Sequence, residues 1–264
     1  MMDYTLIRSN RKTIAMQVKD GKLIVRAPIK AAKRDVDAAV AKFEPELEAM
    51  LKNNIALIER RAAFSLNYGD TVLYRGKEYP IAARPGGRVC FDDANGEFCV
   101  PSNLSPELIK AAVVQLYKML AGRHLAGRLL HFQPLLGVSV TNFHITNAKG
   151  RWGSMSRRKS VSFSWRLILA DDDIIDCVVV HELAHIKEFN HSKAFWAEVE
   201  KIIPDWRERE ARLRSLSRKI NAENWDVDRK AASMAESVPS ADSPSAYRRH
   251  FADYKTILSP QNGI

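Results

Sequence analysis

The pattern of apolar residues changes from alternating to helical within the first 63 residues. Polar and apolar residues alternate over residues 4–27, on both sides of the pair Asp20-Gly21. Alternation predicts half-buried strands, and Asp-Gly between two such runs predicts a hairpin turn. From Lys33 to about Ala63 the apolar spacing is helical. It predicts two helices, or one kinked helix, and Pro45 suits the first turn of the second.

The rest of the pattern alternates between strand-like and helical segments. Residues 71–100 hold short apolar runs divided by glycine-containing turns, which predicts a β-rich block. Ser105-Pro106 supplies an N-cap and a first-turn proline for a helix that we expect to end near Phe132, before Pro134. Strand patterns return over 138–146 and 151–169, and acidic residues at 171–173 suit the start of a helix over 172–189.

The C-terminal segment differs in composition from the rest of the chain. Residues 232–246 are rich in Ser, Ala and Pro, which is typical of a linker, and residues 247–258 could form a short helix. Residues 221–264 carry 5 Lys and Arg against 6 Asp and Glu. The net charge of +10 therefore arises within residues 1–220, and it favours an anionic partner.

Composition excludes several classes of protein. An apolar content of 46% in 264 residues excludes a disordered or collagen-like chain. No apolar run approaches the roughly 18 residues that span a bilayer, and the first residues lack the pattern of a signal peptide. We therefore expect a cytoplasmic protein without a membrane partner.

The three cysteines give no sign of a disulfide framework, because their number is odd and the chain is long. A two-residue turn at Asn95-Gly96 would place Cys99 opposite Asp92 and Cys90 opposite Pro101. We expect plain thiols.

The strongest chemical signal is the motif H-E-x-x-H at residues 181–185, inside a helical pattern. Positions i and i+4 share one face of a helix, so His181 and His185 can bind a single Zn²⁺ ion. Glu182 would lie beside the water that the metal activates and would act as a general base. Such a motif arises by chance in roughly one chain in a hundred of this length, and the alternative is a pair of ordinary histidines on a structural helix.

A catalytic zinc site needs a third protein ligand and an open position. His191 is the first candidate, because Asn190 can end the helix before it and Ser192 can cap a new helix over 193–203. His191 would then lie at a corner between two helices. The alternatives are glutamates of the same region, namely Glu188, Glu198 and Glu200.

The motif and its surroundings resemble a known family. The segments concerned are Arg151-Trp152-Gly153-Ser154, a strand ending in Trp165-Arg166-Leu167, residues 179–185, Asn190-His191-Ser192 and Phe195-Trp196. Together they resemble the YgjP-like family of metal-dependent hydrolases, which is related to SprT-like and WLM zinc proteases. The resemblance covers roughly residues 10–215. It implies metal ligands at His181, His185 and His191 and a catalytic acid at Glu182. The family commonly has a cysteine where this chain has Met155.

Other residues near the motif have both structural and functional interpretations. Arg151 and Trp152 precede a strand glycine, so they could bind substrate, while Trp152 could equally fill the core. His144 could donate to an oxyanion or be an ordinary strand histidine. The basic residues 157–159 fit a solvated turn or a phosphate contact. Phe195 and Trp196 are expected to anchor the core.

These observations predict an α+β fold and a metal-dependent hydrolase. The expected parts are a β-rich portion over 1–100 with helices at 33–63, a zincin-like core over 101–220 with the H-E-x-x-H helix, and a linker and tail over 221–264. We expect a zinc metallopeptidase acting on a peptide. The alternatives are a nucleoside triphosphate pyrophosphatase, which would bind an anionic nucleotide, and a nucleic-acid-associated module with structural zinc.

Overall fold

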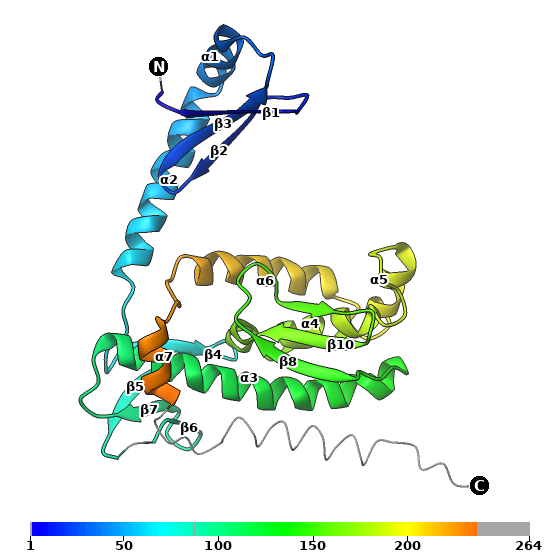
Figure 1. Cartoon of the computed structure of the whole chain (residues 1–264). Coiled ribbons are helices and arrows are strands. Elements are labelled where there is room, and N and C mark those ends of the chain that lie inside the picture. Colours follow the sequence, from blue (N-terminus) through cyan, green and yellow to red (C-terminus); the bar gives the residue numbers. More distant parts are fainter. Residues whose placement is uncertain (1, 87, 237–264) are drawn as a thin grey trace. The chain divides into compact units, whose positions relative to one another are not determined.

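The computed structural model describes residues 2–86 and 88–236, and this part of the chain is an α+β protein (Figure 1). The expected fold class is thereby confirmed. The described residues divide into two compact units. One runs to Phe64 and includes Ala222–Asn224, and the other comprises Ser65–Asn221 and the residues from Trp225 onward. No helix in the described ranges has the length and apolar character needed to cross a membrane.

The first unit contains a three-stranded sheet in the order β1-β3-β2. Strands β2 (Ala15–Lys19) and β3 (Lys22–Pro28) form the expected hairpin, and Asp20 and Gly21 adopt φ values of 50° and 71°. Both central residues of a type I′ turn require positive φ, which explains the Asp-Gly pair. Strand β1 (Thr5–Ser9) pairs with β3 in parallel, so it is not part of the hairpin.

Two helices cover this sheet, as the spacing of apolar residues predicts. Helix α1 (Lys33–Lys42) and helix α2 (Glu44–Ala63) are separated at Phe43, and Pro45 lies in the first turn of α2. Proline is compatible with that turn because the first N–H groups of a helix have no intrahelical partner. The buried core of the unit consists of Leu23, Val25, Ala27, Val36, Val40 and Leu47.

The second unit begins with a four-stranded sheet in the order β4-β5-β7-β6. Its strands are β4 (Thr71–Tyr74), β5 (Lys77–Arg84), β6 (Cys90–Asp92) and β7 (Glu97–Pro101). The β6–β7 turn has four residues, so Cys90 lies directly opposite Cys99, which corrects the register expected above. The Asp92 carboxylate accepts hydrogen bonds from the backbone of Ala94 and Asn95, and this Asx turn starts the reversal before Asn95-Gly96.

The four-stranded sheet is attached to the rest of its unit rather than to the N-terminal residues. The ring of Phe98 lies 5.3 Å from that of Tyr117, a buried residue of the long helix α3. The β4–β5 turn also contacts the segment before α4: Arg75 N donates to Ile168 O at 2.9 Å, and the Arg75 side chain pairs with Asp172. The structural division therefore falls after Phe64, whereas the sequence suggested residue 100.

Helix α3 (Pro106–Leu136) is the central helix of this unit and contacts β8, α4 and α7 (Figure 1). The Ser105 side chain caps its start by accepting from Leu108 N at 3.4 Å. The helix continues through Pro134 and ends at Gly137, which has a φ of 63°. The expected stop before Pro134 is therefore wrong. A proline in the last turn removes one backbone hydrogen bond, and left-handed Gly137 supplies the termination.

The second sheet of this unit has the order β8-β10-β9. Strand β10 (Ser160–Ser164) pairs in parallel with β8 (Asn142–Thr146) and antiparallel with β9 (Gly153–Met155). The segment expected to extend the strand to residue 169 is instead a 3₁₀ helix, η1 (Trp165–Leu169). Its five residues are all buried, and a short apolar run of this kind does not distinguish a strand from a helix.

The remaining helices are α4 (Asp172–Ala184), α5 (Lys193–Glu200), α6 (Trp206–Asn221) and α7 (Arg229–Glu236). Helix α4 ends five residues before the expected position 189, and α5 ends before 203. Residues 232–236, expected to be linker, belong to α7. The expected helix over 247–258 lies outside the described residues.

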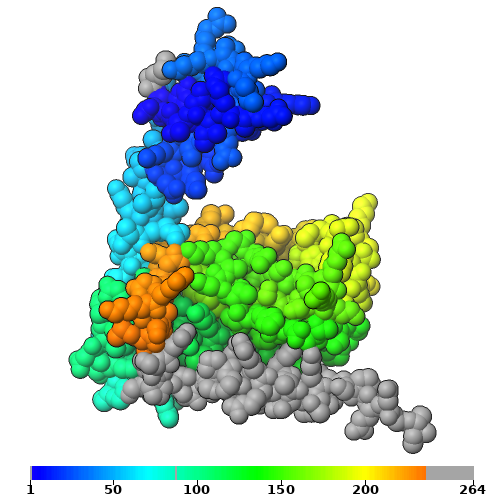
Figure 2. All heavy atoms as spheres, in the orientation of Figure 1, coloured from blue at the N-terminus to red at the C-terminus, as the bar shows by residue number. Residues whose placement is uncertain are grey.

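Residues 225–236 of the C-terminal segment are packed on the second unit. Ala231 and Ala235 of α7 are buried together with Ala111 of α3. Trp225 is only 5% exposed, and its ring lies 5.8 Å from Tyr117 and 5.9 Å from Trp165. Figure 2 shows α7, in orange, on the surface of this unit.

Candidate metal centre

Helix α4 is buried in the second unit between α3 and α6. Asp171 precedes α4, and Asp172 and Asp173 lie in its first turn, where they complement the helix dipole. Arg212 of α6 pairs with Asp171 and Asp173. Val179, Val180 and Leu183 are 0% exposed and fix the helix in the core. This packing leaves the opposite face of α4 to carry the H-E-x-x-H residues.

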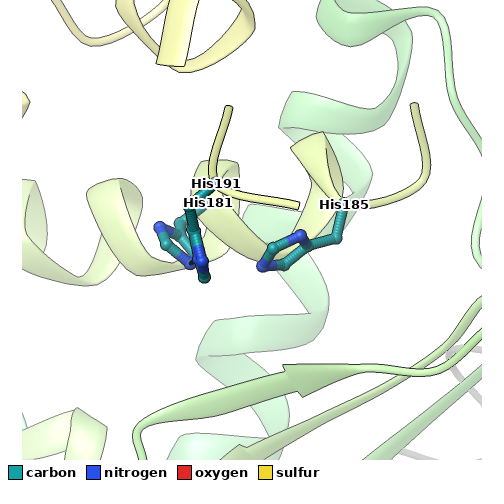
Figure 3. Close-up of side chains that lie close together, drawn as sticks. All are labelled: His181, His185 and His191. Atoms are coloured by element: carbon teal, nitrogen blue, oxygen red, sulfur yellow. Dashed lines mark hydrogen bonds between the residues drawn. The ribbon is translucent and has the colours of Figure 1, made fainter. Parts of the chain in front are cut away.

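Three histidines converge at the end of α4 (Figure 3). His181 projects from α4, His185 caps the end of that helix one turn later, and His191 reaches them from the segment before α5. One ring nitrogen from each histidine lies within 4.8 Å of the other two. The Nε2 atoms of His181 and His191 are 3.0 Å apart.

A tight corner between α4 and α5 places His191. Helix α4 stops at Ala184, and Ile186 N donates to Leu183 O in a tighter turn. Ser192 then caps α5 as expected, accepting from Phe195 N at 3.3 Å. Because α4 ends early, the whole segment 185–191 is available to bring His191 back over the helix.

The alternative glutamates have other contacts or positions. Glu198 is paired with Lys187 at 2.7 Å and with Lys201, and Glu200 with Arg207 at 3.3 Å. Neither of these residues nor Glu188 belongs to the group of converging donors in the described ranges. The arrangement therefore favours His191 over all three as a third ligand.

Neighbouring groups orient the histidine rings. His185 Nδ1 lies 3.1 Å from the carbonyl oxygen of Glu188, so its Nε2 atom is left for another partner. Phe195 is 0% exposed, and its ring lies 4.6 to 4.9 Å from those of the three histidines. Trp196 stacks on Trp206 at 3.8 Å. Phe195 and Trp196 thus pack beneath the site, as expected.

Burial sets the charge state of the histidine rings. It lowers the pKa of His181 to about 4, and the neighbouring His185 and His191 act in the same direction. Burial also lowers the pKa of His185, while the Glu188 carbonyl opposes the shift. A ring without a proton on the facing nitrogen offers a lone pair to a metal.

Glu182 is a buried carboxylate, 6% exposed, adjacent to these rings. Burial raises its pKa to about 7, and both a hydrogen bond from the Met155 backbone and the charge of Arg151 oppose that shift. A Cβ atom on Gly153 would lie 2.6 Å from Glu182 Cγ and Oε1. The glycine of β9 is therefore required for the close approach of this strand to α4.

A cavity of about 210 Å³ opens beside His181 and Glu182. Trp152 and Gly153 form one wall, and residues of α4 and α6 form the others. The apolar lining residues are Ile174, Cys177, Val178 and Leu213, with Arg209 and Glu210 as its polar members. Sequence reasoning missed the α6 residues, because no local motif links positions 209–213 to a site at 181–191.

The proposed substrate residues lie in different places. Trp152 is half-buried, lines the cavity and donates from Nε1 to Ser217 Oγ at 3.2 Å. Arg151 is exposed and close enough to Glu182 to influence its pKa. His144 is exposed on β8, which lies at the opposite edge of its sheet from β9. The structure thus places Trp152 and Arg151 near Glu182 and places His144 apart.

The basic turn at 157–159 joins β9 to β10. Arg157 lies over the ring of Phe189, 6.0 Å from its centre. Phe189 belongs to the segment 185–191 between α4 and α5, which we call the histidine corner. Positive charge is therefore present at this corner.

A family model described as a YgjP-like metallopeptidase domain matches residues 12–216 of the chain. Among solved structures, the metallopeptidase zymogen of Pyrococcus abyssi abylysin is 26% identical, in a match that covers 34% of this chain and 92% of that chain with a TM-score of 0.33. No curated protein matches the chain.

Proposed function

The chain belongs to the YgjP-like metallopeptidase family, and from that premise we propose that it is a zinc-dependent peptidase whose metal is held by His181, His185 and His191. The observation that carries this proposal is the convergence of three imidazoles beside one buried carboxylate. Glu182 is assigned the role of general base. Three protein ligands leave one coordination position open, which is typical of catalytic rather than structural zinc.

The donor set fits zinc. Zn²⁺ accepts imidazole nitrogen at about 2.0–2.1 Å, and tetrahedral ligands at that distance lie about 3.3 Å from one another. The 3.0 Å separation of His181 Nε2 and His191 Nε2 is close to that value. The contact between His185 Nδ1 and the Glu188 carbonyl is of the kind that orients metal-binding histidines.

The chain's own residues account for the movement of the proton. When bound, zinc supplies a Lewis acid that lowers the pKa of water and polarises a carbonyl. A carboxylate oxygen of Glu182 accepts the proton of the attacking water and then delivers it to the nitrogen of the leaving amine. The Met155 backbone holds that carboxylate in place by a hydrogen bond.

The surroundings of Glu182 support a peptide substrate. Strand β9 is an edge strand in the order β8-β10-β9, and an edge strand can pair with an extended peptide. The largely apolar cavity beside Glu182 is large enough for a side chain of such a peptide. Trp152 lies between these two features, and we assign it a substrate contact.

A second candidate, a nucleoside triphosphate pyrophosphatase, is favoured by a different observation. Arg157 lies at the histidine corner over Phe189, and Arg151 lies near Glu182. Guanidinium groups bind phosphate through charge-assisted hydrogen bonds. In that case alanine at Arg157 and Arg158 would raise KM steeply and in a salt-dependent way, whereas a peptide held by its backbone would be affected little.

Activity profiling of the zinc-loaded full chain tests the proposal. We expect cleavage of unstructured peptides that a chelator abolishes, and we expect Glu182→Gln to retain zinc and lose turnover. Hydrolysis of nucleoside triphosphates with no peptide cleavage would replace the peptidase by the second candidate. Full peptidase activity in Glu182→Gln would remove the assigned base.

A further inference from the structure

Two cysteines lie directly opposite one another in the sheet remote from the histidines. Cys90 of β6 pairs with Cys99 of β7 in antiparallel register, and both are free thiols. Opposed residues in antiparallel strands have Cα atoms about 4.5 or 5.5 Å apart, and a disulfide requires about 4.4–6.8 Å. The backbone is therefore already in place for a bond between the two sulfurs.

The side chains support the same conclusion. The nearby Cys90 thiol acts to raise the pKa of Cys99, so the two side chains lie close together. Cys90 is partly exposed, whereas Cys99 is 5% exposed. An external oxidant therefore meets Cys90 first, and Cys99 is positioned to react second.

A guanidinium group accompanies the buried thiol. Arg84 of β5 interacts with the sulfur of Cys99 and pairs with Glu97. Burial raises the pKa of Cys99 to about 11, Arg84 opposes this shift, and the neighbouring Cys90 and Glu97 add to it. Positive charge beside a thiol favours the thiolate, which is the form that attacks sulfur.

Asp92 and Glu97 lie on the same face of the hairpin as the two thiols, and the Cys99 thiol donates to Glu97 Oε1 at 3.7 Å. Asp92 accepts from the backbone of Ala94 and Asn95 in the turn, and Glu97 pairs with Arg84. Both carboxylates therefore already have partners, Asp92 in the turn and Glu97 on β5, and the arrangement favours sulfur chemistry over a cation site.

We propose that Cys90 and Cys99 form a reversible modification site, a cross-strand disulfide made by exchange with glutathione disulfide. The Cys90 thiolate attacks one sulfur of glutathione disulfide, whose S–S bond breaks, and one glutathione leaves. The Cys99 thiolate then attacks the Cys90 sulfur and expels the second glutathione. The protein loses two electrons and two protons, and these reduce one glutathione disulfide to two glutathione molecules.

The bond would join β6 to β7 covalently across a ring of residues 90–99. Phe91 and Phe98 form the next opposed pair, with rings 5.2 Å apart, and Phe98 is buried in the core. Restricting this hairpin constrains the unfolded chain, so the oxidised protein should melt at a higher temperature.

Incubation of the full chain with glutathione disulfide tests the proposal. Titratable thiols should fall from three to one per chain, and peptide mapping without reductant should join the Cys90 and Cys99 peptides. In Cys177→Ser, the matched control, the count should fall from two to zero. Cys99→Ser should instead trap one glutathione on Cys90, because no second thiol can expel it.

Three outcomes would overturn the proposal. They are retention of all three thiols, a glutathione adduct on Cys90 of the wild type that does not resolve, and a disulfide that involves Cys177 or joins two chains. Arg84→Gln provides a further readout, because loss of the guanidinium should shift the pH dependence of disulfide closure to higher pH. An unchanged profile would remove the role assigned to Arg84.

Discussion

At the scale of single residues, the third ligand is the first point to test. His191→Ala should weaken zinc affinity by a large factor while leaving the fold intact, because His191 is exposed and contributes little to the core. Glu200→Gln, which changes an exposed residue that pairs with Arg207, should leave zinc affinity unchanged. Isothermal titration of both variants makes the comparison. Equal affinity in His191→Ala and wild type would show that another group completes the site.

Gly153 allows a test of the approach between β9 and α4. Gly153→Ala would place a methyl group 2.6 Å from Glu182 Cγ, so the carboxylate must move. We expect zinc content to be retained and kcat to fall by about 100-fold, since a displacement of about 1 Å has that effect on catalysis. Gly150→Ala is the matched control, because a Cβ there meets no atom within 4 Å. Equal loss in both variants would contradict the explanation.

His124 of α3 makes stability depend on pH. Burial lowers its pKa to about 4, and Arg75 acts in the same direction, while Asp172 at 3.3 Å opposes the shift. The folded state thus holds the proton less tightly than the unfolded chain, whose histidine titrates near 6.5. Stability should be lost as pH falls below about 6.5, by roughly 1–2 kcal/mol between pH 7 and pH 5.

The contribution of His124 can be isolated with His124→Gln, which does not titrate. Thermal melts at pH 7 and pH 5 should show a smaller loss of Tm in this variant than in the wild type. An identical loss in both proteins would assign the acid sensitivity to other groups.

At the scale of elements, Trp225 connects the C-terminal segment to the core. Its ring packs against Tyr117 and Trp165, and it is 5% exposed. Trp225→Ala should destabilise the second unit by about 3–5 kcal/mol, the usual cost of truncating a buried tryptophan. Trp225→Phe should recover part of the loss. Chemical denaturation measures both, and a neutral Trp225→Ala would show that the segment only rests on the surface.

The elements also show which features can be predicted from sequence. The helix pair at 33–63, the Asp-Gly hairpin and the Ser192 cap depend on neighbouring residues, and all three were predicted. The turn and helix end that were predicted wrongly depend on competition between local signals. Asp92 starts its turn before Asn95-Gly96, and Gly137 rather than Pro134 ends α3. The early end of α4 at Ala184 has no comparable signal in the sequence.

The residues of the candidate site also divide into those that the local sequence predicts and those that only the packing of the fold brings together. His181, Glu182 and His185 follow from helical periodicity, and His191 follows from the corner before Ser192. The α6 residues of the cavity lie more than 20 positions beyond α4, and packing alone brings them to it. The opposed pair of Cys90 and Cys99 was missed for a local reason, since one wrong turn length changes every partner along the hairpin.

At the scale of the whole molecule, the division after Phe64 makes a separate prediction. The three histidines, Glu182 and the cavity all lie in the second unit. A chain that starts at Ser65 should therefore bind zinc with the affinity of the full chain, as titration would show. Aggregation of that shortened chain, or a loss of zinc binding, would mean that the first unit is needed to form the site.

The contact between the β4–β5 turn and the start of α4 holds one end of that helix in place. Arg75 pairs with Asp172, at the first residue of α4, and His181 lies nine residues further along. At 1.5 Å per residue, His181 lies about 13.5 Å along the helix axis from Asp172, so a tilt of α4 by about 5° at Asp172 would displace the His181 backbone by about 1.2 Å. The position of His181 therefore depends on a turn in another sheet, and we expect damage to that turn to reduce the proposed activity before it reduces the helix content of the protein.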